Sequence, residues 1–159
     1  MNGAFQIRGA TETDAEAILE ITRDAFGKYC KMAGIADIEA LHEGLEDVKR
    51  DITEKTVLVA YLDNIVVGSL RLTFNEDDKT AYLSRFGVSR EYRNNGIGKA
   101  LVNVADMNAR RRGMKRMRLH TASKLTEIVR FYYSRGFYIE SVSGERGYLR
   151  AEMVKDYIT

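Results

Sequence analysis

The chain has no proline, no tryptophan and a single cysteine among its 159 residues. One cysteine, Cys30, excludes an intrachain disulfide, and a lone thiol of this kind is most often a buried structural residue. The two histidines, His42 and His120, lie far from Cys30 and from each other in the sequence. Because a structural metal site needs several such ligands at short spacings, no metal is expected.

Long apolar runs and a strong charge imbalance are also missing. No segment approaches the roughly 20 apolar residues that cross a bilayer, and residues 1–5 lack the basic and apolar regions of a secretory signal, so the cytoplasm is the expected compartment. The 25 basic and 23 acidic residues leave a formal net charge of +2, which is too small to require nucleic acid or an anionic membrane as a partner. One domain, residues 1–159, is expected for a chain of this length.

The spacing of apolar residues predicts the elements of the N-terminal part. A strand over residues 5–8 precedes a helix that begins at Thr13, because Glu16 stands at the spacing of a capping box. This helix is expected to end near Phe26. Residues 27–36 are expected to form a loop, and residues 37–52 carry apolar side chains at the spacing of a second helix.

The remaining two thirds of the chain alternate between strand and helix patterns. Strands over residues 56–62 and 65–74 are separated by Asp63-Asn64, a two-residue hairpin turn. A strand over 80–88, a helix over 96–112 with Gly113 as its C-terminal cap, a strand over 114–121, a helix over 123–135 and strands over 137–142 and 147–154 follow. The order β-α-α-β-β-β-α-β-α-β-β predicts an α/β (α+β) fold with a mixed, mostly antiparallel central sheet, one parallel crossover and flanking helices.

The most informative segment is the turn between the strand that ends at Val88 and the helix that begins at Gly96. Glycines at 96 and 98 let an anion approach the backbone, and a helix N-terminus presents unpaired amides and the positive end of its dipole. A P-loop is excluded, because Arg93 and Ala100 stand where it needs glycine and a hydroxyl, and the third glycine of a Rossmann turn is missing. The residues alone leave two interpretations open: a pyrophosphate site, or glycines that ease the start of a helix.

Two motifs are similar to those of a known family. The run Arg93-Asn94-Asn95-Gly96-Ile97-Gly98 resembles the Arg/Gln-x-x-Gly-x-Gly/Ala signature of the GNAT superfamily of N-acetyltransferases. Residues 131–137 resemble the family's Tyr-x-x-x-Gly-Phe segment, at the family's separation, and the resemblance covers roughly residues 57–154. It implies a GNAT-like fold and an N-acetyltransferase that moves an acetyl group from acetyl-coenzyme A to a primary amine, on a small molecule or peptide, by direct attack on the thioester.

The resemblance also implies where the co-substrate binds. Backbone amides from Asn94 to Lys99 would hold the pyrophosphate of coenzyme A, and the end of the preceding strand would pair with the pantetheine arm. The expected cofactor-binding residues are Phe86, Gly87, Val88, Arg93, Asn94, Asn95, Gly96, Ile97, Gly98 and Lys99.

Tyr132 is the expected general acid. Leu125, Val129 and Tyr132 share one helical stripe and face inward, whereas Tyr133 is turned away by about 100°. A tyrosine, with a pKa near 10, can protonate a departing thiolate whose conjugate acid has a pKa of about 8.5. Without the resemblance, an inward tyrosine is simply a packed core residue.

The general base departs from the family's pattern. Many members carry a glutamate in the strand before Val88, but Tyr82 and Ser84 stand there, and residues 81–89 include no carboxylate. Three routes for the amine's proton stay open: a water chain through Ser84, one through Tyr82, or His120 as general base. Leu125 replaces an asparagine that often contacts pantetheine. The missing glutamate supports an alternative function, an acyl-coenzyme A binding or sensing module without turnover.

The basic run over residues 110–118 raises a further alternative, a nucleic-acid binder. Positive charge at a helix C-terminus ordinarily complements the helix dipole, and no aromatic residues interleave it to stack bases. The expected partner is therefore an amine acceptor and neither nucleic acid nor membrane, and the sequence leaves a homodimer open. The acceptor is expected between the N-terminal helices and the C-terminal hairpin, with Tyr29, Met32 and Tyr148 as candidates for its lining.

Overall fold

The computed structural model describes residues 4–157, over which seven strands form one sheet in the order β1-β2-β3-β4-β5-β7-β6. The strands are β1 (Gln6–Gly9), β2 (Thr56–Leu62), β3 (Ile65–Asn75), β4 (Thr80–Val88), β5 (Arg116–Ala122), β6 (Tyr138–Ser143) and β7 (Arg150–Asp156). Every pair is antiparallel except β4 with β5. The mixed, mostly antiparallel sheet with one parallel crossover is thus confirmed.

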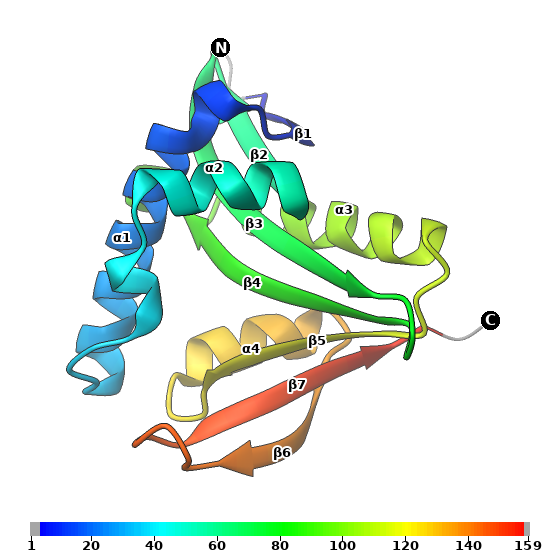
Figure 1. Ribbon diagram of the computed structural model, residues 1–159. Coiled ribbons are helices and arrows are strands. Elements are labelled where there is room, and N and C mark those ends of the chain that lie inside the picture. The colour runs from blue at the N-terminus through cyan, green and yellow to red at the C-terminus, as the bar shows by residue number, and fades with distance from the viewer. Residues whose placement is uncertain (1–3, 158–159) are drawn as a thin grey trace.

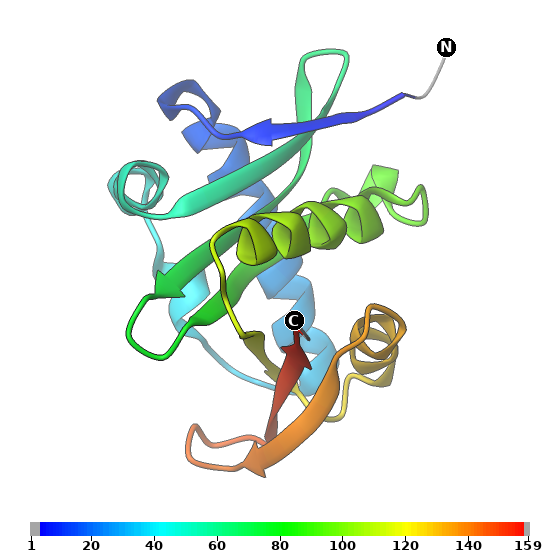
Figure 2. The same cartoon turned by 90° about the vertical axis from the view of Figure 1, so that its right-hand side faces the viewer.

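Helices cover both faces of this sheet (Figures 1 and 2). They are α1 (Ala15–Ala33), α2 (Leu45–Glu54), α3 (Ile97–Arg111) and α4 (Thr126–Ser134), with short 3-10 turns η1 (Glu12–Asp14), η2 (Glu39–His42) and η3 (Arg90–Tyr92). Helix α1 packs on β3 and β4 and α2 packs on β2, whereas α3 packs on the opposite face. An apolar layer therefore lies on each face of the sheet, between the strands and the helices that cover them.

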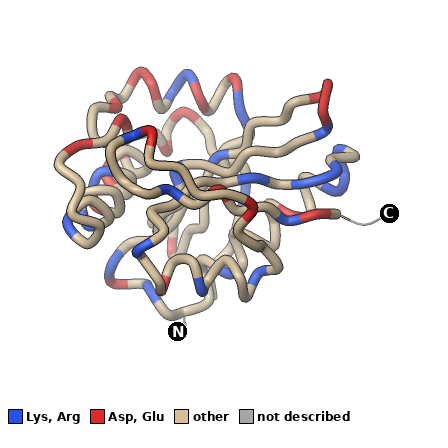
Figure 3. Tube along the Cα trace, turned by 90° about the horizontal axis from the view of Figure 1, so that it is seen from below, with Lys and Arg blue, Asp and Glu red and all other residues tan. Residues whose placement is uncertain are grey.

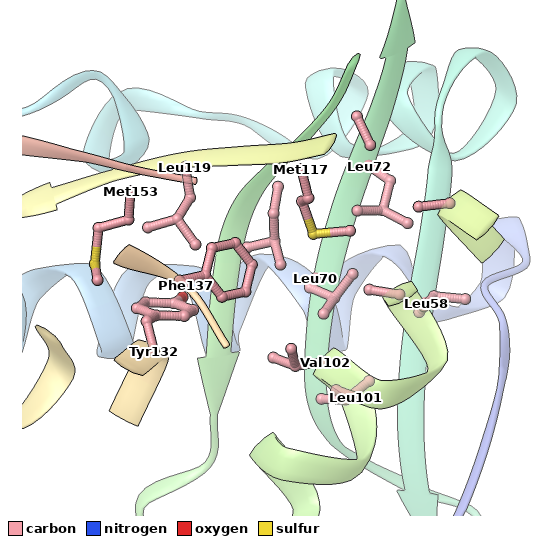
Figure 4. Packing of buried hydrophobic residues seen from close by; sticks show 14 of the residues in the cluster. Leu58, Leu70, Leu72, Leu101, Val102, Met117, Leu119, Tyr132, Phe137 and Met153 are labelled. Atoms are coloured by element: carbon pink, nitrogen blue, oxygen red, sulfur yellow. The ribbon is translucent and has the colours of Figure 1, made fainter. Parts of the chain in front are cut away.

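Strand β2 shows how the two layers arise from alternation in the sequence. Val57 and Val59 pack with Ile18 of α1 and Val48 of α2. The intervening side chains point the other way, into the larger core beneath α3 and α4, because successive residues of a strand face opposite sides of the sheet. Figure 4 shows that core, whose labelled members are Leu58, Leu70, Leu72, Leu101, Val102, Met117, Leu119, Tyr132, Phe137 and Met153.

The sheet is split along the boundary between β4 and β5. These strands pair only from Thr80 to Tyr82, opposite residues 116–118, and then diverge (Figure 1). On its other side β4 contains a bulge: Ser84 pairs with Arg71 and Gly87 with Ser69, so that two residues of β4 face one of β3. Arg85 in the bulge has a φ of 51°. A bulge bends its strand, and here it accompanies the departure of β4 from β5.

The N-terminal helix differs from the prediction in both its start and its length. The start of the helix is fixed by Asp14, whose carboxylate accepts a hydrogen bond from the Thr11 amide at 2.8 Å and pairs with Arg8 at 2.7 Å. The capping pair predicted at Thr13 and Glu16 was therefore wrong. The helix continues to Ala33, and the loop predicted over residues 27–36 was wrong. A single glycine inside a helix costs only about 1 kcal/mol, and Cys30, buried as predicted, extends the packed face of α1 past Gly27.

The helix predicted over residues 37–52 is broken into η2 and α2. Gly44 is extended, with φ −108° and ψ 176°, and its amide donates to Asp47 at 2.8 Å to start α2. The break allows Glu43 to turn inward, where 8% of the residue is exposed. The C-terminal elements occur in the predicted order, with β7 between β5 and β6.

An ionic cluster lies beneath β3 and β4, and Arg71 is its centre. This arginine is 0% exposed and binds both carboxylate oxygens of Glu43, at 2.6 and 2.7 Å. It also donates to Asp51 of α2 at 2.8 Å, while Arg85 of the bulge lies 3.5 Å from Glu43. The cluster ties the segment before α2 to the sheet beside the split.

Candidate active site

The split between β4 and β5 opens into a cavity of about 920 Å³. Its walls come from α1, the η2 segment, β4, the start of α3, β5, α4 and the β6–β7 connection. Tyr132 and His120 both line it, as do Tyr29, Met32 and Tyr148. The predicted cofactor residues that line it are Phe86, Gly87, Val88, Arg93, Asn94, Gly96, Gly98 and Lys99. Of the other two, Ile97 has its side chain in the core, and Asn95 is not part of the wall.

The N-terminus of α3 forms one end of this cavity. Asn94 and Gly96 both adopt left-handed backbone conformations, with φ of 66° and 80°, and no side chain caps the helix. The first helical bond runs from the Ala100 amide to the Gly96 carbonyl at 3.0 Å. The amides of residues 94–99 therefore have no acceptor within residues 4–157. Such a run of free amides, together with the positive end of the helix dipole, suits an anion.

Strand β4 forms the next part of the wall. Past Tyr82 its edge toward β5 has no strand partner among the described residues, so the backbone over residues 86–88 is free to pair with an extended molecule. Two glycines allow close packing here: a Cβ on Gly87 would lie 2.9 Å from the Ala25 Cβ, and one on Gly98 would lie 3.0 Å from the Phe86 ring. Side chains at these positions would push α1 or Phe86 away.

Tyr132 points from α4 into the site. It is 5% exposed, whereas the neighbouring Tyr133 is 51% exposed, so the predicted inward orientation is confirmed. The rings of Phe137, Phe131 and Phe86 surround it, with centroids 5.5, 5.3 and 6.2 Å away, and Figure 4 shows it beside Phe137. Burial raises the pKa of Tyr132, which keeps its hydroxyl protonated. That hydroxyl has no hydrogen-bond partner in the described part of the chain, although the side chain lines the cavity.

Tyr82 and His120 meet where β4 and β5 begin to diverge. The Tyr82 hydroxyl lies 2.6 Å from Nδ1 of His120. The pKa of His120 is lowered, first by burial and then by the nearby Arg150, so the ring is mostly neutral at pH 7. Burial raises the pKa of Tyr82, so this hydroxyl keeps its proton, and it donates to Nδ1 in the His120 tautomer that carries its proton on Nε2. The sequence named both residues, but only the register of the parallel strands brings them together.

Tyr29 spans the split from the opposite side. Its hydroxyl accepts the Ala122 amide, at the end of β5, at 2.7 Å, and burial raises the pKa of Tyr29. The C-terminal part of α1, which was expected to be a loop, is therefore a fixed wall of the cavity.

The basic run over residues 110–118 is largely engaged by acidic and aromatic side chains. Arg112 binds Glu76 at 3.0 Å and Arg116 binds Asp156 at 3.2 Å. Figure 3 shows basic and acidic positions interspersed along the trace. Over residues 4–157, no group of three or more His, Cys, Asp or Glu residues could hold a metal ion, and no helix is long and apolar enough to cross a membrane.

Comparison with known proteins decides the family. Residues 15–137, well over half of the chain, match the model of the Acetyltransferase (GNAT) family. The chain belongs to the GNAT acetyltransferase family. Among curated GNAT relatives, the spermidine N(1)-acetyltransferase of Thermoplasma acidophilum is 24% identical over 151 residues, which span 89% of this chain and 92% of that protein.

Solved structures show the same GNAT fold. The PaiA N-acetyltransferase from Thermoplasma acidophilum, in complex with coenzyme A, is similar with a TM-score of 0.84 and 24% identity, over 98% of this chain and 100% of that chain. YncA from Salmonella typhimurium, with its cofactor acetyl-CoA, has a TM-score of 0.79 and 20% identity, over 99% of this chain and 96% of that one. At these identities the structures establish the fold of this acetyltransferase and leave its acceptor open.

Proposed function

We propose that this acetyltransferase moves the acetyl group of acetyl-coenzyme A to a primary amine by direct attack of the amine on the thioester. The observation that carries the proposal is the run of uncapped amides over residues 94–99, which lies in one cavity with the free edge of β4 and the Tyr132 hydroxyl. A diphosphate, an extended amide-containing arm and a thioester occur in that order in acetyl-coenzyme A.

The binding roles follow the chemistry of each wall. The amides of Asn94, Asn95, Gly96, Ile97, Gly98 and Lys99 would bind the pyrophosphate, since backbone N–H groups at a helix N-terminus favour anions. Arg93 and Lys99 would add positive charge there. The backbone of Phe86, Gly87 and Val88 would pair with the pantetheine arm as a further strand does.

In the chemical step, the amine nitrogen forms a bond to the thioester carbon, and the carbon–sulfur bond breaks as the carbonyl re-forms. The products are an N-acetyl amine and the coenzyme A thiol. Tyr132 supplies the proton that the leaving sulfur takes up, and it is reprotonated by the second proton that the attacking nitrogen loses as the amide forms. Because burial raises the pKa of Tyr132, its hydroxyl gives up this proton only as negative charge develops on sulfur, and its hydrogen bond stabilises that charge in a poorly solvated site.

The amine must lose a proton, and the Tyr82–His120 pair offers a route. An amine with a pKa near 10.4 is protonated at pH 7. It would donate to the Tyr82 oxygen while the Tyr82 proton passes over 2.6 Å to Nδ1 of His120. His120 is thus the proposed general base, and Tyr82 takes the position of the missing glutamate as a relay. Tyr82 on β4 contacts the His120 ring. The charged groups that affect its pKa are Arg118 on β5, Glu152 and Arg150 on β7, and Arg146 in the β6–β7 connection.

Replacing His120 with glutamine should lower kcat about 10–100-fold, at or below the lower limit of the usual contribution of a general base, because water can reach the ring and replace it in part. Protonated His120 cannot accept a proton, and its pKa lies below 6.5. The kcat of the native enzyme should therefore fall as the pH drops through that pKa, and the fall should be absent from H120Q.

The pH dependence of kcat at saturating acetyl-coenzyme A measures this. His42→Gln is the matched control: His42 also lines the cavity but binds Asp37 at 2.6 Å, and H42Q should keep the acidic fall. The same acidic fall in H120Q would exclude His120 as the base.

A negative charge at the start of α3 should weaken cofactor binding. Gly96→Asp and Gly96→Ala both place a side chain at a φ of 80°, and aspartate tolerates this conformation at least as well as alanine. A lower affinity of G96D than of G96A therefore reports charge and not strain. Coenzyme A should bind at least about tenfold more weakly to G96D than to G96A, as measured by isothermal titration calorimetry. Equal affinities would place the pyrophosphate elsewhere.

The direct test of the function is release of free thiol when the protein is incubated with acetyl-coenzyme A and a panel of primary amines. Thiol release that requires the amine, with a mass increase of the acceptor by one acetyl group, is the expected result. Binding of acetyl-coenzyme A without amine-dependent thiol release would instead indicate an acyl-coenzyme A binding or sensing module.

A further inference from the structure

Two arginines on the cavity wall have no counter-charge. Arg146, in the β6–β7 connection, and Arg150, at the start of β7, both line the cavity. Neither makes an ion pair or a side-chain hydrogen bond with any residue from 4 to 157. Arg118 on β5 lies outside the cavity lining and binds Glu140 and Glu152 at 2.7 and 3.0 Å. Among the described residues, Arg118 is thus paired with carboxylates, whereas Arg146 and Arg150, which line the cavity, are not.

The strand register places Arg150 close to the proposed base. Arg150 pairs with Ala122 and Glu152 pairs with His120 across β5 and β7. Residues two apart in a strand share a face, so Arg150 is the diagonal neighbour of His120, at roughly 7–8 Å between backbone positions. The lowered pKa of His120, to which Arg150 and Arg146 contribute, agrees with this placement.

The other charges of this part of the wall do not cancel the two arginines. Asp37 is engaged by His42 at 2.6 Å, and the Arg85 guanidinium lies 3.5 Å from Glu43. Lys28 adds a further positive charge, and Glu39 is the carboxylate of the η2 wall that has no cationic partner among the described residues. The remaining carboxylate of the lining, Glu127, lies in the first turn of α4.

Resting on the proposed function, we propose that the acceptor is a primary amine that also carries a carboxylate or a phosphate group, which Arg150 and Arg146 bind while the amine faces Tyr82 and His120. A guanidinium presents paired N–H donors that match a carboxylate or phosphate. A polyamine, the acceptor named for the Thermoplasma acidophilum relative, would bring cations against these arginines, and like charges at close range oppose binding.

Matched acceptors test this preference. One pair is an amino acid and the amine formed by its decarboxylation, phenylalanine with phenethylamine; a second is phosphoethanolamine with ethanolamine. Spermidine serves as the cationic acceptor. In each pair the member that carries the carboxylate or phosphate should have the higher kcat/KM, by about 10–100-fold, as expected for a charge-assisted hydrogen bond. The two pairs separate carboxylate from phosphate as the preferred group.

Substitutions of Arg150 and Arg146 test whether these two side chains cause the preference for an anionic group on the acceptor. Arg150→Gln and Arg146→Gln should each reduce the ratio of kcat/KM between the two members of each pair, and Arg150→Glu should raise the kcat/KM for spermidine above that of the native enzyme. Such an absolute gain with spermidine cannot come from partial unfolding. Arg111→Gln, at an exposed position outside the cavity wall, should leave every ratio unchanged.

The outcomes distinguish failure of the acceptor inference from failure of the proposed function. Acetylation of phenethylamine, ethanolamine or spermidine as efficiently as of the amines that carry a carboxylate or phosphate would overturn the inference while the acetyltransferase function stands. An anionic preference that survives in both arginine variants would also overturn it. If acetyl-coenzyme A binds but no amine of the panel releases thiol, the proposed function fails and the inference fails with it.

Discussion

Replacing Tyr132 with phenylalanine is expected to reduce kcat about 10²–10⁴-fold and to leave the affinity for coenzyme A nearly unchanged. The substitution removes one hydroxyl, which makes no hydrogen bond within the described residues and lies in the cavity wall. The ring contacts with Phe137, Phe131 and Phe86 remain, so the core stays packed. What is lost is the proposed donor to the departing sulfur.

Steady-state kinetics at saturating acetyl-coenzyme A and calorimetric titration with coenzyme A measure the two quantities. Tyr133→Phe is the matched control, because the same hydroxyl is removed from the adjacent residue, which is 51% exposed. Its turnover should stay close to that of the native enzyme. A Y132F protein with native turnover would remove Tyr132 from the mechanism and return it to the role of a packed core residue.

Replacing Arg71 with leucine should lower the free energy of unfolding by about 3–5 kcal/mol. The change leaves Glu43 in a buried position, and Asp51 partly buried, without the guanidinium that binds them at 2.6–2.8 Å. Glu43 would keep only the longer contact with Arg85, at 3.5 Å. Because a buried carboxylate that loses its main partner is costly, both the unfolding midpoint in urea and the thermal midpoint should fall. The η2 segment, which Glu43 anchors, should lose its fixed position on the cavity wall.

Urea denaturation followed by circular dichroism measures this difference. Arg50→Leu is the control, since Arg50 binds Asp47 at 2.6 Å on the surface of α2, where an ion pair contributes little. Arg71→Leu combined with Glu43→Gln should recover part of the lost stability, because the second change removes the stranded charge. A loss in R71L no larger than that in R50L would show that the cluster is not a stabilising element.

The sequence predicted the elements wherever local pattern and tertiary structure agree. The hairpin at Asp63-Asn64 needs two residues with positive φ, and both have it, at 50° and 67°. The predictions were wrong where a distant residue decided the outcome. Arg8 on β1 recruits Asp14, which moves the start of the first helix, and Arg71 on β3 draws Glu43 inward, which divides the second.

In the candidate site, too, local spacing predicted some residues and only the fold brought the others together. Gly96 and Gly98 stand in one short turn, so their spacing could be interpreted before any fold was known. Tyr82 and His120 are separated by 38 residues. They come together where the parallel pairing ends, since Tyr82 pairs with Arg118 and His120 lies two residues further along β5. Arg150 joins them through the β5–β7 register. No local spacing reveals such a group, because it exists only once the sheet has formed and β4 has separated from β5.

The short parallel pairing of β4 with β5 has a mechanical consequence. Two smaller sheets meet over three residue pairs at one end, and the Tyr29 hydroxyl links α1 to β5 near the other. A molecule that lies between the diverging strands and pairs with the open edge of β4 would take the place of a further strand. It would hold the two smaller sheets at a fixed separation. The co-substrate of such a protein is then also part of its scaffold, and each catalytic cycle removes that part and puts it back.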